Sequence, residues 1–504
     1  MLALVPSATL AGVDGLAVSV EAHVGSGLPA FTVVGLPDTS CREARDRIRA
    51  AFASSGFAFP DRRITVNLAP TGQRKAGAAT DLAIAVGLLV ASEALAPEAI
   101  AGVGFIGELG LDGTIHSVEG AVPLLDAVDA DPVVVPLGNT IEAQVVGRQG
   151  IRSASTLREL VDALAHITPW PDLPAVPPVG DEPSCPDLAD VRGQPMARFG
   201  LEIAAAGAHP LLFVGPPGSG KSMLASRLPG ILPPLDEQAA RRVTCIHSAA
   251  GVRLPPTGLV VRPPYRAPHH TSSRVSLIGG GTQTMRPGEA SLAHRGVLFL
   301  DELGEFDAGT LDAFRQPLED GAIRVARAHG SITLPAEFLL VAASNPCPCG
   351  WDGPQGRCRC SSHARARYLR RLSGPLLDRF DLRVTVGRPD TADLLGSDAG
   401  ESSSSVRARV DAVRQLALER GFGLNGELGT DQLNLVAPLA PAAFRMLERA
   451  LEAGRLTGRG LVRVRRVART IADLRGMGTT IDEAVVAAAL ALRGEPFEFE
   501  LAAA

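Results

Sequence analysis

A run of glycine, proline, serine and lysine residues near the middle of the chain has the spacing of a phosphate-binding loop. It follows an apolar run at 210–214, which predicts a buried strand, and precedes 223–228, which predicts a helix. In this setting backbone N–H groups and the positive end of the helix surround phosphates. The lysine would contact the β- and γ-phosphates, and the last serine would bind Mg²⁺. The residues that we assign to nucleotide binding are Gly215, Pro216, Pro217, Gly218, Ser219, Gly220, Lys221 and Ser222. Only two lysines occur in the chain, Lys75 and Lys221.

An acidic pair follows a second apolar run. Residues 296–300 predict a strand, and Asp301 and Glu302 come directly after it. In the same sheet as a phosphate loop, Asp301 would bind Mg²⁺ directly or through water. Glu302 would act as general base toward the attacking water. The alternative is a solvated acidic turn, and the long apolar approach favours the catalytic interpretation.

Three further side chains are candidates for the same chemistry. Asn345 ends a third apolar strand, 338–344, and is suited to orienting water or contacting the γ-phosphate. Arg379 follows a short predicted helix, and a guanidinium brought to the γ-phosphate stabilises transition-state charge. An ordinary surface arginine has the same spacing, so this alternative stays open. Arg459 begins a helix in the C-terminal part, from which it could reach back to nucleotide.

Four cysteines form two close pairs across a glycine-rich loop, 347–360. Four thiolates can complete a tetrahedral zinc site, and a reducing compartment leaves them available. The alternative is four thiols without metal. The candidate zinc ligands are Cys347, Cys349, Cys358 and Cys360.

Composition limits the broad class of protein. The chain has 504 residues, of which 46% are hydrophobic and 20% charged, with a formal net charge of −5. This length predicts roughly three globular domains, and any nucleic-acid surface must be local because the net charge is unremarkable. No apolar run approaches the roughly 20 residues that span a bilayer, and the N-terminal segment lacks signal-peptide features. We therefore expect a cytoplasmic protein without membrane contact, whose seven cysteines stay reduced.

Predicted elements divide the chain into α/β domains and a helical end. Strand and helix patterns alternate in an N-terminal domain, 1–165, and again around the phosphate loop in 190–387, which favours a parallel sheet. A proline-rich linker at 166–189 separates them. Residues 388–504 predict a helical lid, with a mobile serine-rich connector at 397–405. We expect strands at 16–24, 30–34, 64–68, 104–111 and 132–136, and helices at 39–54, 81–90, 406–420, 442–453, 460–475 and 481–493.

These motifs together resemble the magnesium-chelatase-like AAA+ ATPases, and more narrowly their ComM/YifB branch. The resemblance covers nearly the whole chain and implies ATP and Mg²⁺ as cofactors. It implies that Asn345 is sensor 1, that Arg379 is an arginine finger acting on a neighbouring subunit, and that Arg459 is sensor 2. A finger acting in trans implies a ring, usually a hexamer, and the family carries a hairpin that matches 322–334. The supporting segments are 266–271, 279–281, 287–294, 345–350, 373–379 and 468–473.

The N-terminal domain resembles the proteolytic domain of Lon proteases, which has the ribosomal S5 domain 2-like fold. By this resemblance Ala79 stands where the nucleophilic serine would be, and Val122 stands near the position of its lysine partner. An alanine methyl group cannot attack a carbonyl, and valine cannot accept a proton. We therefore expect a domain without peptidase activity that serves assembly or substrate docking.

Two arginine-rich stretches indicate a phosphate-backbone partner. One runs from Arg357 to Arg371 without an acidic residue, and the other spans Arg455 to Arg475. The hairpin adds Arg324, Arg327 and His329. Arginine clusters bind phosphate backbones, and the few aromatic residues make base stacking secondary. Subunit-interface and nucleotide contacts are the alternative use of these arginines.

The leading hypothesis is a hexameric DNA motor or helicase that promotes branch migration of recombination intermediates during natural transformation, as the ComM resemblance implies. One alternative is the motor subunit of a metal chelatase that inserts Mg²⁺ into a tetrapyrrole. Others are a protein-remodelling AAA+ chaperone, for which we find no aromatic-hydrophobic pore pair, and an ATP-gated scaffold.

Overall fold

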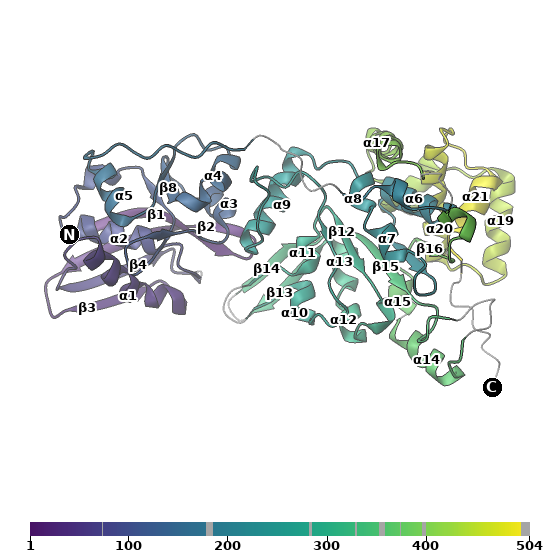
Figure 1. The fold of residues 1–504 in the computed structure, drawn as a ribbon, viewed down its shortest axis with the longest axis horizontal. Helices are drawn as coiled ribbons and strands as arrows, with labels where there is room; N and C mark the ends of the chain where they lie inside the picture. Colours follow the sequence, from purple (N-terminus) through teal and green to yellow (C-terminus); the bar gives the residue numbers. More distant parts are fainter. Residues whose placement is uncertain are drawn as a thin grey trace.

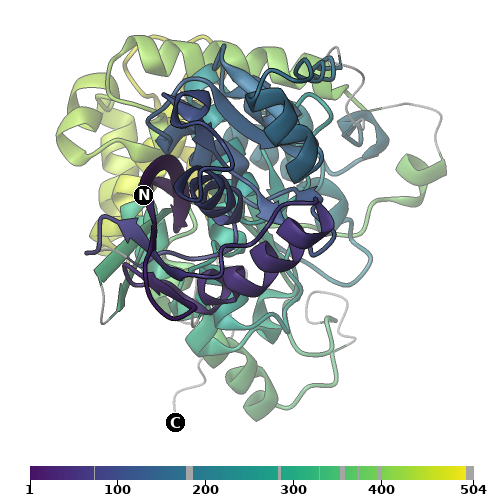
Figure 2. The same cartoon turned by 90° about the vertical axis from the view of Figure 1, so that its left-hand side faces the viewer.

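The N-terminal module and the C-terminal helices lie at opposite ends of one long axis (Figure 1). Figure 2 views the molecule from the end that carries the N-terminal module, drawn in purple and blue. No helix among the described residues combines the length and apolar character that crossing a bilayer requires. The computed structural model describes residues 1–72, 74–177, 185–281, 285–327, 330–351, 358–372, 374–395 and 400–494.

The N-terminal module runs from β1 to α5. Its elements are β1 (Leu2–Ala11), β2 (Asp14–Gly25), β3 (Ala30–Val34), α1 (Thr39–Ser54), β4 (Arg63–Ala69), α2 (Asp81–Ala91), β5 (Gly104–Phe105), β6 (Glu108–Leu109), β7 (Ile115–His116), α3 (Ala121–Ala127), β8 (Val133–Pro136), α4 (Thr140–Val145), β9 (Ile151–Ala154) and α5 (Leu157–Leu164).

Two main sheets organise this module. One has the order β1-β2-β4-β3, and the other is the parallel sheet β5-β8-β9. Every residue of α2 is buried, and the helix packs on β1 and β2. The single strand expected at 104–111 is instead two short ones, β5 and β6, which belong to different sheets.

The P-loop module contains the predicted phosphate loop. Its elements are α6 (Pro195–Gly207), β10 (Leu211–Val214), α7 (Lys221–Ala225), α8 (Leu228–Ile231), α9 (Glu237–Ala249), β11 (Tyr265–Arg266), α10 (Arg274–Ile278), α11 (Glu289–Leu292), β12 (Val297–Leu300), α12 (Ala308–Asp312), α13 (Arg315–Asp320), β13 (Ala322–Arg327), β14 (Gly330–Pro335), β15 (Leu339–Ser344), α14 (Ser362–Arg371), α15 (Gly374–Leu377), β16 (Leu382–Thr385) and α16 (Thr391–Leu395).

A five-stranded sheet forms the centre of this module. Its order is β11-β12-β15-β10-β16, and all neighbouring strands are parallel. Every residue of β10, β12 and β15 is buried, as expected of strands covered on both faces. Because the strands are parallel, the segments that follow β10, β12 and β15 leave the sheet at the same edge. The expected hairpin is present as antiparallel β13 and β14.

The C-terminal segment is helical, as the sequence predicts. Its helices are α17 (Ser403–Glu419), α18 (Thr430–Val436), α19 (Pro441–Glu452), α20 (Gly458–Leu474) and α21 (Glu483–Ala491). The prediction of a connector at 397–405 is wrong at its C-terminal end, because α17 already starts at Ser403. The Ser402 hydroxyl caps α17 by accepting the Ser405 N–H, the usual role of serine at a helix start. Residues 397–399 of that connector lie outside the described residues.

The N-terminal module docks on α9 of the P-loop module. Helix α3 packs against α9, and the Gly120 N–H donates to the Ser248 carbonyl oxygen at 2.9 Å. The Ser248 hydroxyl donates to Glu142 at 2.7 Å across the same boundary. Around this contact lie three ion pairs, which are Asp14–Arg242, Asp126–Arg241 and Glu119–Arg286.

Candidate functional site

The loop between β10 and α7 has the backbone shape that phosphate binding requires. Gly218 and Gly220 have φ of +75° and +89°, which glycine adopts readily and other residues rarely. A Cβ at either position would meet no atom within 4 Å, so conformation rather than crowding requires glycine there. Gly215 is different, because its Cβ would lie 2.1 Å from the carbonyl oxygen of Val386. The loop therefore packs directly against the chain that leaves β16.

The side chain of Lys221 is buried within this loop. Its Nζ donates to the carbonyl oxygens of Gly215 at 2.7 Å and Pro216 at 3.0 Å. It also donates to Oδ1 of Asn345 at 3.3 Å. Burial lowers the pKa of Lys221, and the nearby Asp301 carboxylate opposes that shift. The predicted phosphate-binding lysine and the residue expected at the end of the third strand are thus in direct contact.

Ser222 and Asp301 meet at the start of α7. The Ser222 hydroxyl donates to Oδ2 of Asp301 at 2.5 Å. Hydroxyl and carboxylate oxygens are the ligands that Mg²⁺ prefers, and the open glycine loop beside them offers backbone N–H groups and an ammonium to phosphates. This donor set fits a nucleotide with its Mg²⁺, which Ser222, Asp301 and Lys221 would hold.

Glu302 has a backbone conformation that few non-glycine residues adopt. Its φ is +51°, and just over half of its side chain is exposed. Its Oε2 lies 3.2 Å from Nδ1 of His270, and the His270 ring lies against that of His269. From the sequence, this histidine pair was recognisable only as part of the family segment 266–271. The contact with Glu302 depends on a loop whose course the sequence does not specify.

Asn345 is held from behind by a tyrosine of α14. The Tyr368 hydroxyl donates to the carbonyl oxygen of Asn345 at 3.2 Å and lies 3.1 Å from the Ser344 hydroxyl. A Cβ at Gly304 would lie 2.3 Å from the Tyr368 ring, so glycine is required for this close approach. Helix α14 is therefore fixed to the segments that carry both Asn345 and the acidic pair.

The two remaining predicted arginines lie elsewhere. Arg379 follows α15, forms an ion pair with Glu319 of α13, and keeps 15% of its side chain exposed. Arg459 is the second residue of α20 and is exposed. Among the hydrogen bonds and ion pairs between described residues, neither guanidinium contacts the phosphate loop of its own chain. Their assigned roles stay predictions.

A buried polar cluster behind Arg379 was missed by sequence analysis. Nδ1 of His209 lies 2.9 Å from Asp381, and its Nε2 lies 2.7 Å from the Thr470 hydroxyl. Arg463 donates to the same carboxylate at 2.7 Å. Burial raises the pKa of Asp381, but His209 and Arg463 outweigh this and lower it. The cluster joins the strand edge to α20 through residues far apart in sequence, so no local pattern could indicate it.

The four predicted metal-ligating cysteines come together. Their sulfurs all lie within 4.8 Å of one another, and Cys347 is buried. The sulfur of Cys347 lies 3.3 Å from that of Cys349 and 3.6 Å from that of Cys358. The cluster lies just beyond Asn345 and just before α14.

The basic surfaces are only partly described. Helix α14 carries exposed His363, Arg367, Arg370 and Arg371, and Arg324 is exposed on β13. Arg357 and His329, which the sequence groups with them, lie outside the described residues, as does the side chain of Arg327.

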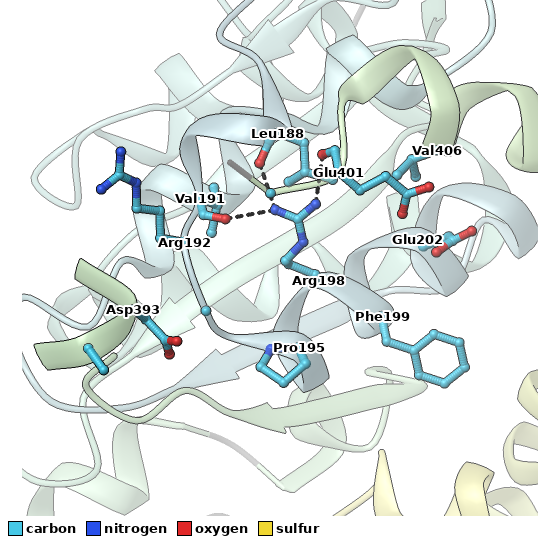
Figure 3. A pocket seen from close by; sticks show the side chains of 13 residues that line it. Leu188, Val191, Arg192, Pro195, Arg198, Phe199, Glu202, Asp393, Glu401 and Val406 are labelled. Atoms are coloured by element: carbon cyan, nitrogen blue, oxygen red, sulfur yellow. Dashed lines mark hydrogen bonds between the residues drawn. The ribbon is translucent and has the colours of Figure 1, made fainter. Parts of the chain in front are cut away.

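A pocket of about 630 Å³ lies between the start of α6 and the segment before α17 (Figure 3). Arg198 points across it and donates to the carbonyl oxygens of Leu188 and Glu401. Gln194, at the start of α6, donates to the carbonyl oxygen of Ser219 and so ties this region to the phosphate loop. The pocket was not predictable from the sequence, because its two sides are distant in sequence. Its lining residues are Leu188, Val191, Arg192, Gly193, Pro195, Arg198, Phe199, Glu202, Ala392, Asp393, Gly400, Glu401 and Val406.

The parallel sheet, with a phosphate loop, an acidic pair and a polar residue on adjacent strand ends, defines an AAA+ P-loop protein. Three family descriptions match the chain. They are "Subunit ChlI of Mg-chelatase" over residues 20–139, "Magnesium chelatase, subunit ChlI" over 187–394, and "Magnesium chelatase, subunit ChlI C-terminal" over 400–493.

Similar proteins cover nearly the whole chain. Competence protein ComM of Haemophilus influenzae is 41% identical over 486 residues, which is 94% of each chain. The uncharacterized protein YifB of Escherichia coli is 40% identical over 94% of this chain and 93% of its own length. The magnesium-chelatase 38 kDa subunit of Acidiphilium rubrum is 28% identical over 58% of this chain and 86% of its own. The chain belongs to the ComM/YifB branch of the magnesium-chelatase-like AAA+ family.

Proposed function

We propose that this protein is an ATP-hydrolysing DNA motor that assembles as a hexameric ring. It would act as a helicase that promotes branch migration of recombination intermediates. The observation that carries the ATPase part is the meeting of Lys221, Asn345, Ser222 and Asp301 at one edge of the sheet. Two observations support the DNA part. One is 41% sequence identity to a competence protein over 94% of the chain, and the other is the set of arginines on α14.

Bound ATP and Mg²⁺ would supply the cleavable phosphoanhydride bond and neutralise its charge. In this proposal Lys221 and the loop N–H groups hold the phosphates, and Ser222 and Asp301 bind the metal. Glu302 holds the attacking water and accepts its proton. Asn345 keeps that water in line. Gln194 ties the start of α6 to the phosphate loop. This segment, beside the pocket of Figure 3, would contact the base of the bound nucleotide.

Arg379 acts on the nucleotide of a neighbouring subunit in the proposed ring. In the isolated subunit, an ion pair with Glu319 holds the guanidinium of Arg379 in place. A phosphate group carries more negative charge than a carboxylate and accepts paired N–H bonds from arginine. The nucleotide of the neighbour can therefore displace Glu319, whose carboxylate is mostly exposed. Arg459 would contact nucleotide as the C-terminal helices close on the sheet.

Helix α14 would contact the DNA backbone. Its first turn holds no acidic residue and its last turn carries Arg370 and Arg371. Tyr368 anchors its buried side beneath Asn345, so a pull on the helix would reach the nucleotide site. Arginines bind phosphates without reading sequence, which suits a motor that must move along any duplex. The exposed Arg324 of the hairpin would add a second contact.

The test compares ATPase rates with and without four-way junctions and forks. Junction DNA should stimulate hydrolysis, and the stimulation should fall as salt rises. The double change Arg367→Glu and Arg370→Glu should abolish stimulation and keep the basal rate. A charge-matched pair on α19, Arg445→Glu and Arg449→Glu, should keep both. Absence of stimulation by any DNA structure at low salt would refute the motor.

A metal-chelatase motor subunit is the second candidate, because the family descriptions and the Acidiphilium relative are chelatase subunits. It predicts hydrolysis stimulated by a porphyrin-binding partner complex and indifferent to DNA. We further propose that the N-terminal module is a protease relative without peptidase activity. Ala79 and Val122 belong to the same buried apolar cluster, which offers no nucleophile or base at these positions.

A further inference from the structure

The sulfur positions of the cysteine cluster match one metal ion. Four thiolates at about 2.3 Å from a tetrahedral Zn²⁺ lie about 3.8 Å from one another. The three sulfur separations among Cys347, Cys349 and Cys358 are 3.3, 3.6 and 3.6 Å. The sulfur of Cys360 lies within 4.8 Å of the others. The four sulfurs thus lie close enough together to share one ion.

Disulfides do not explain this arrangement. A disulfide would bring two sulfurs to about 2.05 Å and leave the remaining pairs unequal. None of these four cysteines is in a disulfide, and three of the separations are nearly equal. The Cys360 N–H also points at the sulfur of Cys358, at 3.4 Å. Such a contact favours a sulfur that carries negative charge.

We propose that these four cysteines bind one structural Zn²⁺, and that the ion fixes Asn345, the phosphate loop and α14 relative to one another. Cys347 stands two residues after Asn345, and Cys360 stands two residues before Ser362, where α14 begins. Gly350, directly after the first pair, lies so close to Pro217 of the phosphate loop that a Cβ there would lie 2.5 Å from its ring. The ion therefore closes a loop whose two ends carry the nucleotide contact and the basic helix.

The surroundings suit a site with four thiolates. Zn²⁺ with four thiolates carries a net charge of −2, and exposed Arg359 lies between two of the ligands. Trp351 follows Gly350, and the guanidinium of Arg388 lies 4.6 Å from the centre of its ring. Only one other tryptophan, Trp170, occurs in the chain, and it packs in the N-terminal module. Trp351 is thus a local reporter of the metal site.

The first experiment measures metal in the full chain purified without chelators, by inductively coupled plasma mass spectrometry. We expect about one zinc per chain. The double change Cys358→Ser and Cys360→Ser should lower the zinc content per chain at least about tenfold. The control Cys185→Ser, at a cysteine outside the cluster, should leave the zinc content unchanged. Less than half an equivalent in the unaltered protein, iron in place of zinc, or equal zinc in both variants would overturn the site.

A second variant guards against misfolding. Cys360→His keeps a donor set of three thiolates and one imidazole, which also binds structural zinc. It should keep about one zinc per chain, whereas Cys360→Ala should lose it. Mercurial titration of the unaltered protein should release zinc as four thiols react. Release of zinc without loss of thiols would contradict thiolate ligation.

The third experiment tests the anchoring role, which rests on the proposed ATPase function. In Trp170→Phe protein, removal of zinc should change Trp351 fluorescence and lower the hydrolysis rate about 10- to 100-fold, because Asn345 loses its position. Unchanged hydrolysis after complete zinc removal would overturn the anchoring. Zinc content and fluorescence need no nucleotide, so a zinc-loaded protein that never hydrolyses ATP would refute the proposed function and leave the metal site standing.

Discussion

The acidic residue proposed as general base stands in an unusual backbone conformation. A non-glycine residue in the left-handed region costs of order 1 kcal/mol or more, and such residues cluster at functional sites. Glu302 has this conformation directly after a fully buried strand. In this conformation the Glu302 carboxylate lies 3.2 Å from Nδ1 of His270.

Replacement of Glu302 by glutamine should stop hydrolysis and spare nucleotide binding. Glutamine keeps the shape but cannot accept the proton, so the rate should fall about 10²- to 10⁴-fold. Single-turnover hydrolysis and fluorescent-nucleotide binding measure the two properties. Glu305→Gln, at an exposed acidic residue three positions away, should leave both unchanged. A Glu302→Gln protein with normal turnover would remove Glu302 from the mechanism.

His270 should restrain Glu302 before the active arrangement forms. Their contact is worth about 0.5–1 kcal/mol for a partly exposed pair, which corresponds to a rate change of about two- to fivefold. We therefore expect His270→Ala to raise the DNA-free ATPase rate by that factor and to reduce stimulation by junctions. His269→Ala removes a neighbouring ring that is hydrogen-bonded to Thr271. It should change neither the DNA-free rate nor the stimulation. A lowered basal rate in His270→Ala would assign His270 a supporting role instead.

At the scale of elements, the three central strands of the P-loop module were predictable, whereas β1 and the outer strands β11 and β16 were not. Buried parallel strands read as continuous apolar runs, which located β10, β12 and β15. Strand β1 contains Pro6 and few β-branched residues, and a proline is tolerated there because β1 is a sheet edge. The pairing that stabilises β1, with Ala3 opposite Ala22 on β2, is visible only in the fold.

A buried histidine between α11 and β12 should make stability depend on pH. The Glu337 N–H donates to Nδ1 of His294, which requires the neutral ring. Burial lowers the pKa of His294 from 6.5 to about 4. Since the unfolded chain binds the proton more readily, stability is complete above about pH 6.5 and is lost as pH falls toward 4, by at most about 3 kcal/mol.

Thermal unfolding of the unaltered protein and of His294→Gln across pH 4.5–7.5 checks this. Glutamine keeps an acceptor and does not titrate, so the difference between the two midpoints should shrink as pH falls. Burial raises the pKa of Asp81 to about 6, but this carboxyl titrates in both proteins and cancels. A difference that is constant with pH would show that His294 does not titrate as described.

At the scale of the whole molecule, one serine of α9 contributes hydrogen bonds to the docking of the N-terminal module. Ser248 contacts both Gly120 and Glu142, and burial raises the pKa of Glu142. Ser248→Ala would remove the hydrogen bond from α9 and leave this carboxyl with the Asn139 amide of its own module, at a cost of about 1–3 kcal/mol. We expect a separate unfolding transition for the N-terminal module and faster proteolysis near residue 170. Ser404→Ala, at an exposed serine of α17, should change neither.

The motifs could be predicted, and most of the contacts that combine them could not. Lys221 and Asp301 were located by local spacing, since each lies beside its own strand. The pairing of Asp14 with Arg242 joins positions 228 residues apart, and that of His209 with Asp381 joins positions 172 residues apart. Such contacts depend on how elements pack in three dimensions, and a single sequence carries no local signal for that. For the same reason Glu319, the partner of Arg379, was not foreseen.

Both lysines of the chain are interior, Lys75 fully and Lys221 nearly so. No lysine side chain is thus presented to solvent. The surface side chains that carry a positive charge at every physiological pH are therefore arginines. Enzymes that acetylate or conjugate lysine would find no acceptor on the folded protein, so its affinity for a polyanion cannot be tuned by that route. Amine-directed cross-linkers would likewise miss contacts between subunits, and carboxyl- or thiol-directed reagents are the ones to map them.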